Sequence, residues 1–215
     1  MCGGFSIFNL VDEKLEATHY SIDSVLPQKL YNARPGMYLP VVIDTDTSGW
    51  RVERALWGIA TKFTKQPLFN AKSETLFTSS FWKQHAGNRC LVPANGFFEW
   101  KLLAGKRSPF YFRVKNRKMF YMAGIFTERN HDGYHFRDFA ILTTEPNRLV
   151  AAVHNRMPMI LDGRAASTWL ASGSKPSDLE PLLKPYDPDK MTSYRVTRDV
   201  NNARNNSEEL IYPLP

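Results

Sequence analysis

Closely spaced turn residues divide this chain into short segments, and that division limits the folds it can adopt. Its 215 residues include 14 prolines and 12 glycines, and no apolar run approaches the roughly 20 residues of a membrane-spanning helix. The segments between the turns are apolar or alternate in polarity, which is typical of short antiparallel strands. We expect strands over residues 5–8, 38–43, 50–58, 89–93, 96–101, 109–114, 119–126, 139–143, 159–161 and 192–198.

Only a few segments have helical character. We expect helices over residues 12–20, 79–85, 147–153, 164–171 and 177–183. The last two are amphipathic, as helices that cover a sheet are. The sequence therefore predicts an α+β fold, with a mostly antiparallel sheet core flanked by helices. There is no internal repeat, so we expect a single domain over residues 1–215.

The composition favours a folded protein with an anionic partner. Hydrophobic residues make up 43% of the chain and aromatic residues 13%, which excludes a disordered protein. The net charge is +7 and the pI is near 9.4, a balance that favours polyanions such as nucleic acids. The first residues lack the basic region and the long apolar stretch of a signal peptide, so we expect a cytoplasmic location.

Metal sites and disulfides are not expected. The only cysteines are Cys2 and Cys90, no CxxC pair is present, and Cys90 falls in an apolar segment typical of a core strand. Residues 44–49 resemble the start of a calcium-binding EF loop, but the twelfth position is Ala55 rather than glutamate. We interpret this loop as a hairpin turn, and we expect no metal and no cofactor.

The first four residues, Met1-Cys2-Gly3-Gly4, are the strongest candidate for a reactive site. Removal of Met1, normal before a small residue, would leave Cys2 with an amine and a thiol on adjacent carbons. The amine of such an aminothiol can act as base for the thiol, or both groups can condense with an aldehyde to a thiazolidine ring. Their pKa values of about 7.7 to 8.5 require a nearby base. The alternative is a small apolar residue in a first strand, although Gly3 and Gly4 allow close approach.

Glu99 and His154 are candidates for proton transfer. If residues 96–101 form a strand, Glu99 shares a face with Phe97, opposite Phe98 and Trp100. A carboxylate among aromatic residues should have a raised pKa, because desolvation disfavours its charged form. The alternative is a surface glutamate on an edge strand. His154 follows a predicted helix, where it could exchange a proton, contact phosphate or serve as a hydrogen-bonded structural residue.

Trp57 is a candidate for stacking on a nucleic-acid base. It ends a predicted strand and precedes a basic segment that contains Lys62 and Lys65. An aromatic ring beside lysines can stack on a base while the lysines meet phosphates. The alternative is a core residue, which is the more common place for a tryptophan at the end of a strand.

Six segments, in this order, carry a resemblance to a known family. They are Met1-Cys2-Gly3, Tyr31–Gly36, Trp57-Gly58, Asn70–Thr75, Gly96–Lys101 and His154–Pro158. Together they resemble the SOS-response-associated peptidase family, the abasic-site processing proteins, over nearly the whole chain. The resemblance implies a barrel-like sheet core with helices outside. It also implies a protein that binds single-stranded DNA at an abasic site, links Cys2 to the sugar aldehyde as a thiazolidine, and so shields the lesion.

The resemblance assigns roles to individual residues. The expected catalytic residues are Cys2, Asn70, Glu99 and His154. The expected DNA-binding residues are Pro35, Trp57, Gly58, Lys72, Trp100 and Arg156. Two positions depart from the family pattern, since Lys72 and Gly4 both stand where arginine is usual. Lysine keeps the charge but loses the bidentate fork of arginine, and Gly4 removes one expected DNA contact.

The resemblance also implies a reaction order and further activities. His154 would open the closed sugar, the Cys2 amine would form an imine with help from Glu99, and the thiol would close the ring. Strand cleavage by β-elimination and a peptidase-type removal of Met1 are further expected activities. We expect a monomer of bacterial or phage type that lies on the nucleoid when bound to DNA.

Two alternative functions remain open on the sequence. Class II glutamine amidotransferases also begin with Met-Cys-Gly, and Asn95-Gly96 resembles their oxyanion pair, but the chain has no Arg-Gly segment to hold the glutamine carboxylate. A plain single-strand-binding protein would bind DNA without any covalent step.

Overall fold

The structure is a computed structural model, and it describes residues 2–8, 29–45 and 49–215. The helix expected over residues 12–20 lies outside the described residues.

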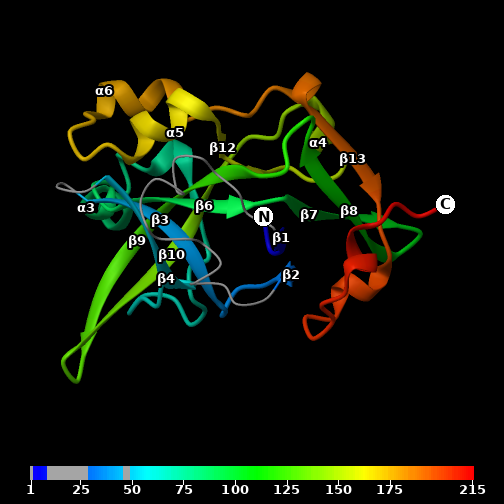
Figure 1. Ribbon diagram of the computed structural model, residues 1–215, viewed down its shortest axis with the longest axis horizontal. Coiled ribbons are helices and arrows are strands. Elements are labelled where there is room, and N and C mark those ends of the chain that lie inside the picture. The colour runs from blue at the N-terminus through cyan, green and yellow to red at the C-terminus, as the bar shows by residue number, and fades with distance from the viewer. Residues whose placement is uncertain (1, 9–28, 46–48) are drawn as a thin grey trace.

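Five strands of the described chain close into a ring. They are β3 (Tyr38–Thr45), β4 (Gly49–Trp57), β6 (Arg89–Ala94), β9 (Phe120–His131) and β10 (Tyr134–Thr144). Antiparallel pairs link β4 to β3, β3 to β6, β6 to β9 and β9 to β10, and a short parallel pair between β10 and β4 closes the circle. The prediction of a mostly antiparallel, barrel-like core is confirmed (Figure 1).

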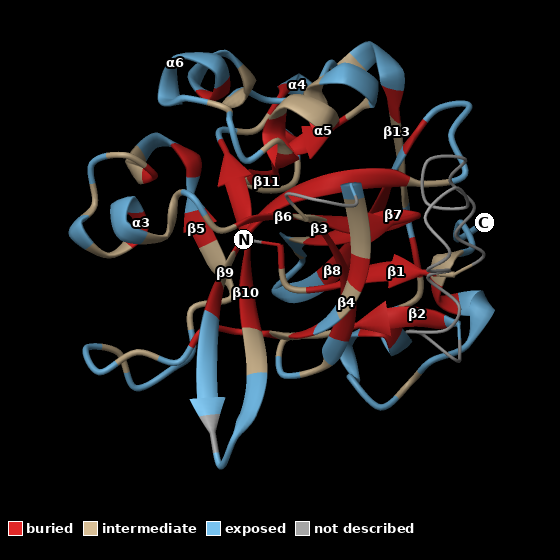
Figure 2. Cartoon of the chain, turned by 60° about the vertical axis from the view of Figure 1, so that its left-hand side comes forward, coloured by how far each residue is buried: buried red, intermediate tan, exposed pale blue. Residues whose placement is uncertain are grey.

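A second sheet lies against this barrel and carries the chain's first strand. Its strands are antiparallel in the order β13 (Met191–Arg195), β8 (Lys106–Val114), β7 (Gly96–Leu103), β1 (Phe5–Ile7) and β2 (Leu30–Ala33). Side chains of both sheets belong to one hydrophobic cluster, which includes Phe97 and Phe112 of the second sheet and Leu91 and Met122 of the barrel. Figure 2 shows that burial is concentrated where the two sheets meet, while the far end of the β9–β10 hairpin is exposed.

One connection differs from the sequence prediction. We expected the strands over 109–114, 119–126 and 139–143 to follow one another in antiparallel order. Instead β8 belongs to the second sheet and β9 to the barrel, so the chain crosses between sheets after Val114. The reason is the pairing of β9, whose first residue Phe120 lies opposite Ala94 of β6 rather than beside β8.

Three very short strands complete the sheets. β5 (Asn70–Lys72) runs parallel to β10, β11 (Met157–Pro158) pairs with β10, and β12 (Ile160–Leu161) pairs with β9. Residues 70–75 show no periodicity, because three strand residues are too few to establish an alternation. This missed strand carries one of the expected catalytic residues.

The helices are short and lie at the edges of the sheets. They are α3 (Ser80–His85), α4 (Arg148–Ala151), α5 (Gly163–Leu170) and α6 (Pro176–Leu179), with 3-10 turns at Ser73–Thr75, Glu180–Leu182, Pro188–Lys190, Arg198–Asn201 and Glu208–Ile211. α5 covers β6 and β9, as its amphipathic pattern predicted. The helix expected over 177–183 is shorter because Pro181 cannot donate a backbone hydrogen bond. No helix in the described chain is long and apolar enough to cross a membrane.

Candidate active site

Strand pairing fixes the position of the N-terminal cysteine. Phe5 lies opposite Phe97, and the ladder continues with a hydrogen bond of 2.9 Å from the Phe98 N–H to the Gly4 carbonyl. This register brings the residues before Gly4 alongside Glu99 of β7. Cys2 is fully buried there.

The Cys2 thiol is held in its protonated form. Burial, and then the negative charge of Glu99, raise the pKa of the Cys2 thiol to about 12. Its Sγ lies 3.9 Å from the Gly4 carbonyl oxygen, a distance that allows a weak S–H donor bond. A thiol in this state is a poor first nucleophile near neutrality.

Asn70 holds the backbone of Cys2. Its Nδ2 donates a 2.9 Å hydrogen bond to the Cys2 carbonyl, and the parallel pairing of β5 with β10 fixes the asparagine itself. Among the described residues, the buried Oδ1 atom of Asn70 has no hydrogen-bond partner. A hydroxyl or an amine of a ligand could donate to this oxygen, in keeping with the expected positioning role.

Trp57 packs under the site residues in the core and does not reach the surface. Its ring stacks on Phe139 and tilts against Phe5, with centroids 6.3 and 5.1 Å away, and its Nε1 donates to the Phe69 carbonyl just before β5. The side chain is 0% exposed. The prediction that Trp57 stacks on a base is therefore wrong for this structure, and the alternative of a core residue is confirmed.

Gly58 is also buried, and its role is one of backbone geometry. Its φ of +135° is rarely adopted by residues with a side chain, and an added Cβ would lie 3.2 Å from the Cβ of Pro67. Its N–H donates to the Phe139 carbonyl. The expected DNA contact of Gly58 is thus not available at the surface of this structure.

Glu99 has the environment that the sequence predicted. The residue is 1% exposed, and burial raises the pKa of its carboxyl from 4.5 to about 7. Phe97 lies in the main core cluster, whereas Phe98 and Trp100 pack in a second cluster on the other face of β7. The predicted alternation is therefore confirmed, and the carboxyl can both accept and donate a proton near neutral pH.

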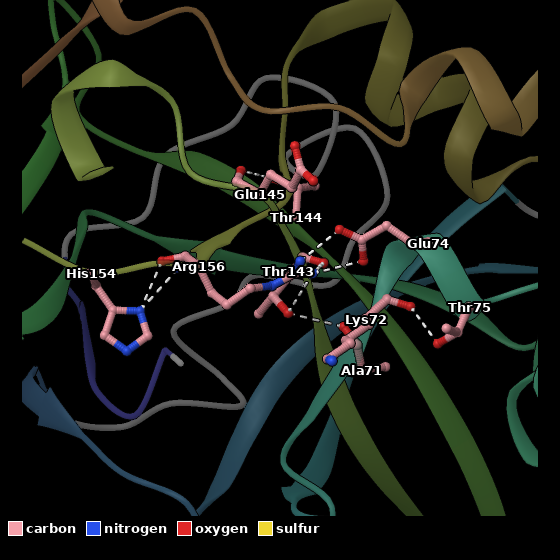
Figure 3. Close-up of polar contacts among 9 residues, drawn as sticks. All are labelled: Ala71, Lys72, Glu74, Thr75, Thr143, Thr144, Glu145, His154 and Arg156. Carbon is pink, nitrogen blue, oxygen red and sulfur yellow. Dashed lines mark hydrogen bonds and ion pairs between the residues drawn. The ribbon is translucent and has the colours of Figure 1, made fainter. Parts of the chain in front are cut away.

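His154 approaches Glu99 from the other side of the site. Its Nδ1 lies 3.8 Å from Oε2 of Glu99 and accepts a 3.0 Å hydrogen bond from the Arg156 N–H (Figure 3). Because Nδ1 accepts this bond, the neutral ring carries its proton on Nε2. Burial lowers the pKa of His154 below its ordinary value, so the neutral ring is the main form near pH 7.

Arg156 is bound within the protein. It forms two hydrogen bonds to the Glu74 carboxylate, of 2.6 and 2.8 Å, and a third to the Thr143 carbonyl (Figure 3). Its side chain is 14% exposed, and this pairing lowers the pKa of Glu74. A phosphate contact by Arg156 would have to compete with Glu74. Lys72, two residues before Glu74, is exposed.

A pocket of about 460 Å³ opens onto Glu99 and His154. The other residues that line it are Gly3, Arg34, Phe69, Trp100, Lys101, Leu102 and Arg107. The sequence analysis singled out Trp100 of these, and Pro35 adjoins Arg34 with its side chain partly exposed. Arg34 was not among the predicted site residues. The signal that could have identified it is its charge, because it interrupts an otherwise uncharged turn segment beside a strand.

Comparison with known sequences decides the family. The profile of the family described as SOS response associated peptidase (SRAP) matches residues 1–203. The chain belongs to this family. It is similar to the abasic site processing proteins YoqW and YoaM of Bacillus subtilis, at 35% and 33% identity, with 98% of this chain covered in both cases and 99% and 97% of the relatives.

The fold of this SRAP chain also matches a solved structure. A crystal structure of a protein from Bacteroides thetaiotaomicron superposes with a TM-score of 0.83 over 100% of both chains, at 23% sequence identity. At that identity the likeness concerns the fold alone. The family assignment from sequence motifs is confirmed, whereas the amidotransferase alternative rested on three residues at the start of the chain.

Proposed function

We propose that this SRAP protein binds abasic sites in single-stranded DNA and joins the lesion covalently through Cys2 once Met1 has been removed. The proposal depends chiefly on one observation: the N-terminal segment is paired into a sheet that sets Cys2 beside a buried glutamate whose pKa is about 7. The names of the relatives, abasic site processing proteins, agree with it.

The first step exposes the sugar aldehyde. An abasic deoxyribose is mostly a closed hemiacetal, and opening it requires a donor at the ring oxygen. His154, neutral and protonated on Nε2, supplies a hydrogen bond to that oxygen. The Glu99 carboxyl, partly protonated near pH 7, is the better source of a whole proton, because burial lowers the pKa of His154. As the bond from C1 to the ring oxygen breaks, the C1 hydroxyl releases its own proton to solvent and its oxygen becomes the aldehyde carbonyl. This refines the role first expected for His154.

The second step forms an imine. The Cys2 amine attacks the aldehyde carbon after Glu99 takes the proton of its ammonium form. Glu99 then returns a proton to the hydroxyl of the carbinolamine, which leaves as water and produces a C=N bond. Asn70 fixes the Cys2 carbonyl during this step, so the amine meets the carbon in one orientation.

The third step closes the ring. The thiol sulfur adds to the imine carbon while its proton passes to the nitrogen, so the thiazolidine forms with the overall loss of one water. The raised pKa of the Cys2 thiol supports this order, since the sulfur stays protonated until the electrophilic imine lies next to it. Without the thiol, the imine could instead undergo β-elimination, which breaks the DNA strand on the 3′ side of the abasic sugar. This is the proposed lyase activity.

Single-stranded DNA would cross the open side of this site. Lys62, Lys65 and Lys72 are exposed on the segment that leads from β4 through β5, and their contacts with phosphates would weaken with salt. Trp100 lines the pocket and replaces the buried Trp57 as the aromatic residue that can meet a base. Pro35 adjoins the same opening. Removal of Met1 by the protein itself is the proposed peptidase activity.

A denaturing gel tests the covalent step. Mature protein is mixed with a single-stranded oligonucleotide that carries one abasic site, and an oligonucleotide with the aldehyde-free tetrahydrofuran analogue serves as control. We expect a band shifted by the mass of the protein with the abasic strand alone. Cys2→Ser keeps the amine, so it should give an adduct only after borohydride trapping. A durable adduct of Cys2→Ser without borohydride would exclude the thiazolidine.

A further inference from the structure

The ring of Trp100, at the mouth of the pocket, lies within cation–π distance of two arginines. The guanidinium carbons of Arg34 and Arg107 lie 5.0 and 5.2 Å from the centroid of its ring, within the range of cation–π contact. The indole is fixed as well, because its Nε1 donates a 2.7 Å hydrogen bond to Asn201. The ring therefore orders two cations from separate strands, β2 with its following turn and β8.

Arg34 is bonded only to neutral oxygen atoms of the described chain. Its Nε donates to the Asn32 side chain at 2.7 Å, one terminal nitrogen donates to the Gly3 carbonyl at 3.0 Å, and the other donates to the Val200 carbonyl. A guanidinium has five N–H groups, so two remain for a ligand. No carboxylate among the described residues forms an ion pair with Arg34, and burial lowers its pKa.

The segment around Arg34 is held as a preformed unit. The Asn32 side chain donates to the carbonyls of Val200, Asn202 and Asn205, which ties the C-terminal turns to β2. Arg34 is thus fixed from both sides before any ligand arrives. Since its Gly3 contact is one residue from Cys2, a ligand on Arg34 lies close to the reactive end of the chain.

The charge of the pocket indicates the kind of ligand. Three cations line it, Arg34, Lys101 and Arg107, against one carboxyl, Glu99, that burial keeps partly neutral. Arg107 is exposed and makes no side-chain hydrogen bond or ion pair with a described residue. Such a site favours an anion that two planar guanidinium groups can hold, and a phosphate has the matching geometry.

We propose that Arg34 and Arg107, both held against the ring of Trp100, bind the phosphodiester group next to the abasic sugar. This inference rests on the proposed function and names the part of the substrate that occupies the β7–β8 side of the pocket. Gly4 leaves room for the Arg34 guanidinium. A Cβ at position 4 would lie 3.1 Å from a terminal nitrogen of Arg34 and 3.2 Å from its Cζ.

The test measures affinity in the absence of chemistry. Single-stranded oligonucleotides carry the tetrahydrofuran analogue, with ordinary phosphates or with one neutral methylphosphonate on its 5′ or its 3′ side. We expect one of these two replacements to weaken binding by the wild-type protein about 3- to 30-fold. We expect Arg107→Ala, and Arg34→Lys which keeps the charge but loses the fork, to weaken binding of the all-phosphate strand by a similar factor.

The decisive result is the combination of protein and DNA changes. If Arg34 and Arg107 share that phosphate, the methylphosphonate should weaken binding by Arg107→Ala clearly less than binding by the wild type, because only the Arg34 contact is left to lose. The salt dependence of Arg107→Ala should be shallower by about 0.7 in log–log slope. Arg117→Ala removes an exposed arginine from the turn after β8 and should bind as the wild type does.

Two different failures are distinguishable. Binding by Arg107→Ala and Arg34→Lys as tight as by Arg117→Ala would overturn the phosphate site, even if the wild type forms its adduct. So would equal losses from the methylphosphonate in wild type and Arg107→Ala. Absence of any wild-type adduct with a true abasic strand would instead overturn the proposed function.

Discussion

Two half-buried arginines flank the reactive residues, and their surroundings differ. Arg156 donates twice to the Glu74 carboxylate and once to Thr143, so its charge is compensated within the protein. Arg34 donates to three neutral oxygens and lies over an aromatic ring. The guanidinium beside β5 and β10 is therefore neutralised within the protein, and the available charge on that side is the exposed Lys72. The guanidiniums of Arg34 and Arg107, beside β2, β7 and β8, have no carboxylate partner among the described residues.

This difference suggests different roles for the arginines: Arg156 supports the structure of the site, and Arg34 and Arg107 can contact a ligand. Arg156 lies two residues after His154, and its backbone N–H donates to the imidazole, so a fixed Arg156 helps to hold His154 in place. Arg34 and Arg107 keep N–H groups for a ligand. The family resemblance, in contrast, places Arg156 among the DNA contacts and assigns no such role to Arg34 or Arg107.

The largest effect is expected at Glu99, the residue between the two sides. Replacement of Glu99 by glutamine removes the proton acceptor while leaving the size of the side chain, so crosslinking should slow by about 10² to 10⁴. Single-turnover rates on an abasic oligonucleotide measure this, with the exposed Glu180→Gln as control. Crosslinking by Glu99→Gln at the wild-type rate would show that this carboxyl takes no part in the mechanism.

Glu99 should also make the stability of the protein depend on pH. Its pKa rises from 4.5 to about 7 on folding. Below about pH 4.5 the carboxyl is neutral in both states and costs nothing. As the pH rises to about 7 it ionises only in the unfolded state, so the folded state loses up to about 3 kcal/mol.

The Glu99→Gln variant lacks this loss and offers a direct comparison. Its free energy of unfolding, relative to that of the wild type, should increase between pH 4.5 and 7 and stay constant above. Urea unfolding of both proteins across this range measures the difference. A constant difference from pH 4.5 to 8 would show that the pKa of Glu99 is not raised.

A smaller effect sharpens the contrast between the arginines. Arg156→Met should reduce stability by about 1 to 2 kcal/mol, since Glu74 loses its partner but is exposed enough for water to reach it. We expect no change in the salt dependence of DNA binding, unlike in Arg107→Ala. If Arg156→Met instead made the salt dependence of DNA binding shallower, the guanidinium of wild-type Arg156 would exchange Glu74 for a phosphate in the complex. The contrast drawn between Arg156 and Arg34 would then be wrong.

Alternation and turn residues were sufficient to predict most strands and the α+β class. The alternation in residues 96–101 located Glu99 correctly, because a strand sends successive side chains to opposite faces. The hairpin that pairs β3 with β4 followed from local turn signals in the same way. The barrel was implied by family resemblance, since ring closure depends on a parallel contact between β4 and β10 that no local pattern encodes.

The site was harder to predict than the fold, because burial and pairing are properties of distant segments. Trp57 lies in the core because Phe5 and Phe139, far away in the chain, enclose it. Arg34 reaches the pocket only because β1 places Gly3 and Gly4 beneath it. A residue's neighbours in sequence say little about such contacts.

The most direct test of the central claim is the intact mass of the protein–DNA product. The account predicts a single species whose mass is that of the protein without Met1 plus the abasic oligonucleotide, less one water, with the DNA remnant on Cys2 after proteolysis. A product that retains Met1, or one whose remnant maps to a lysine such as Lys72, would contradict it.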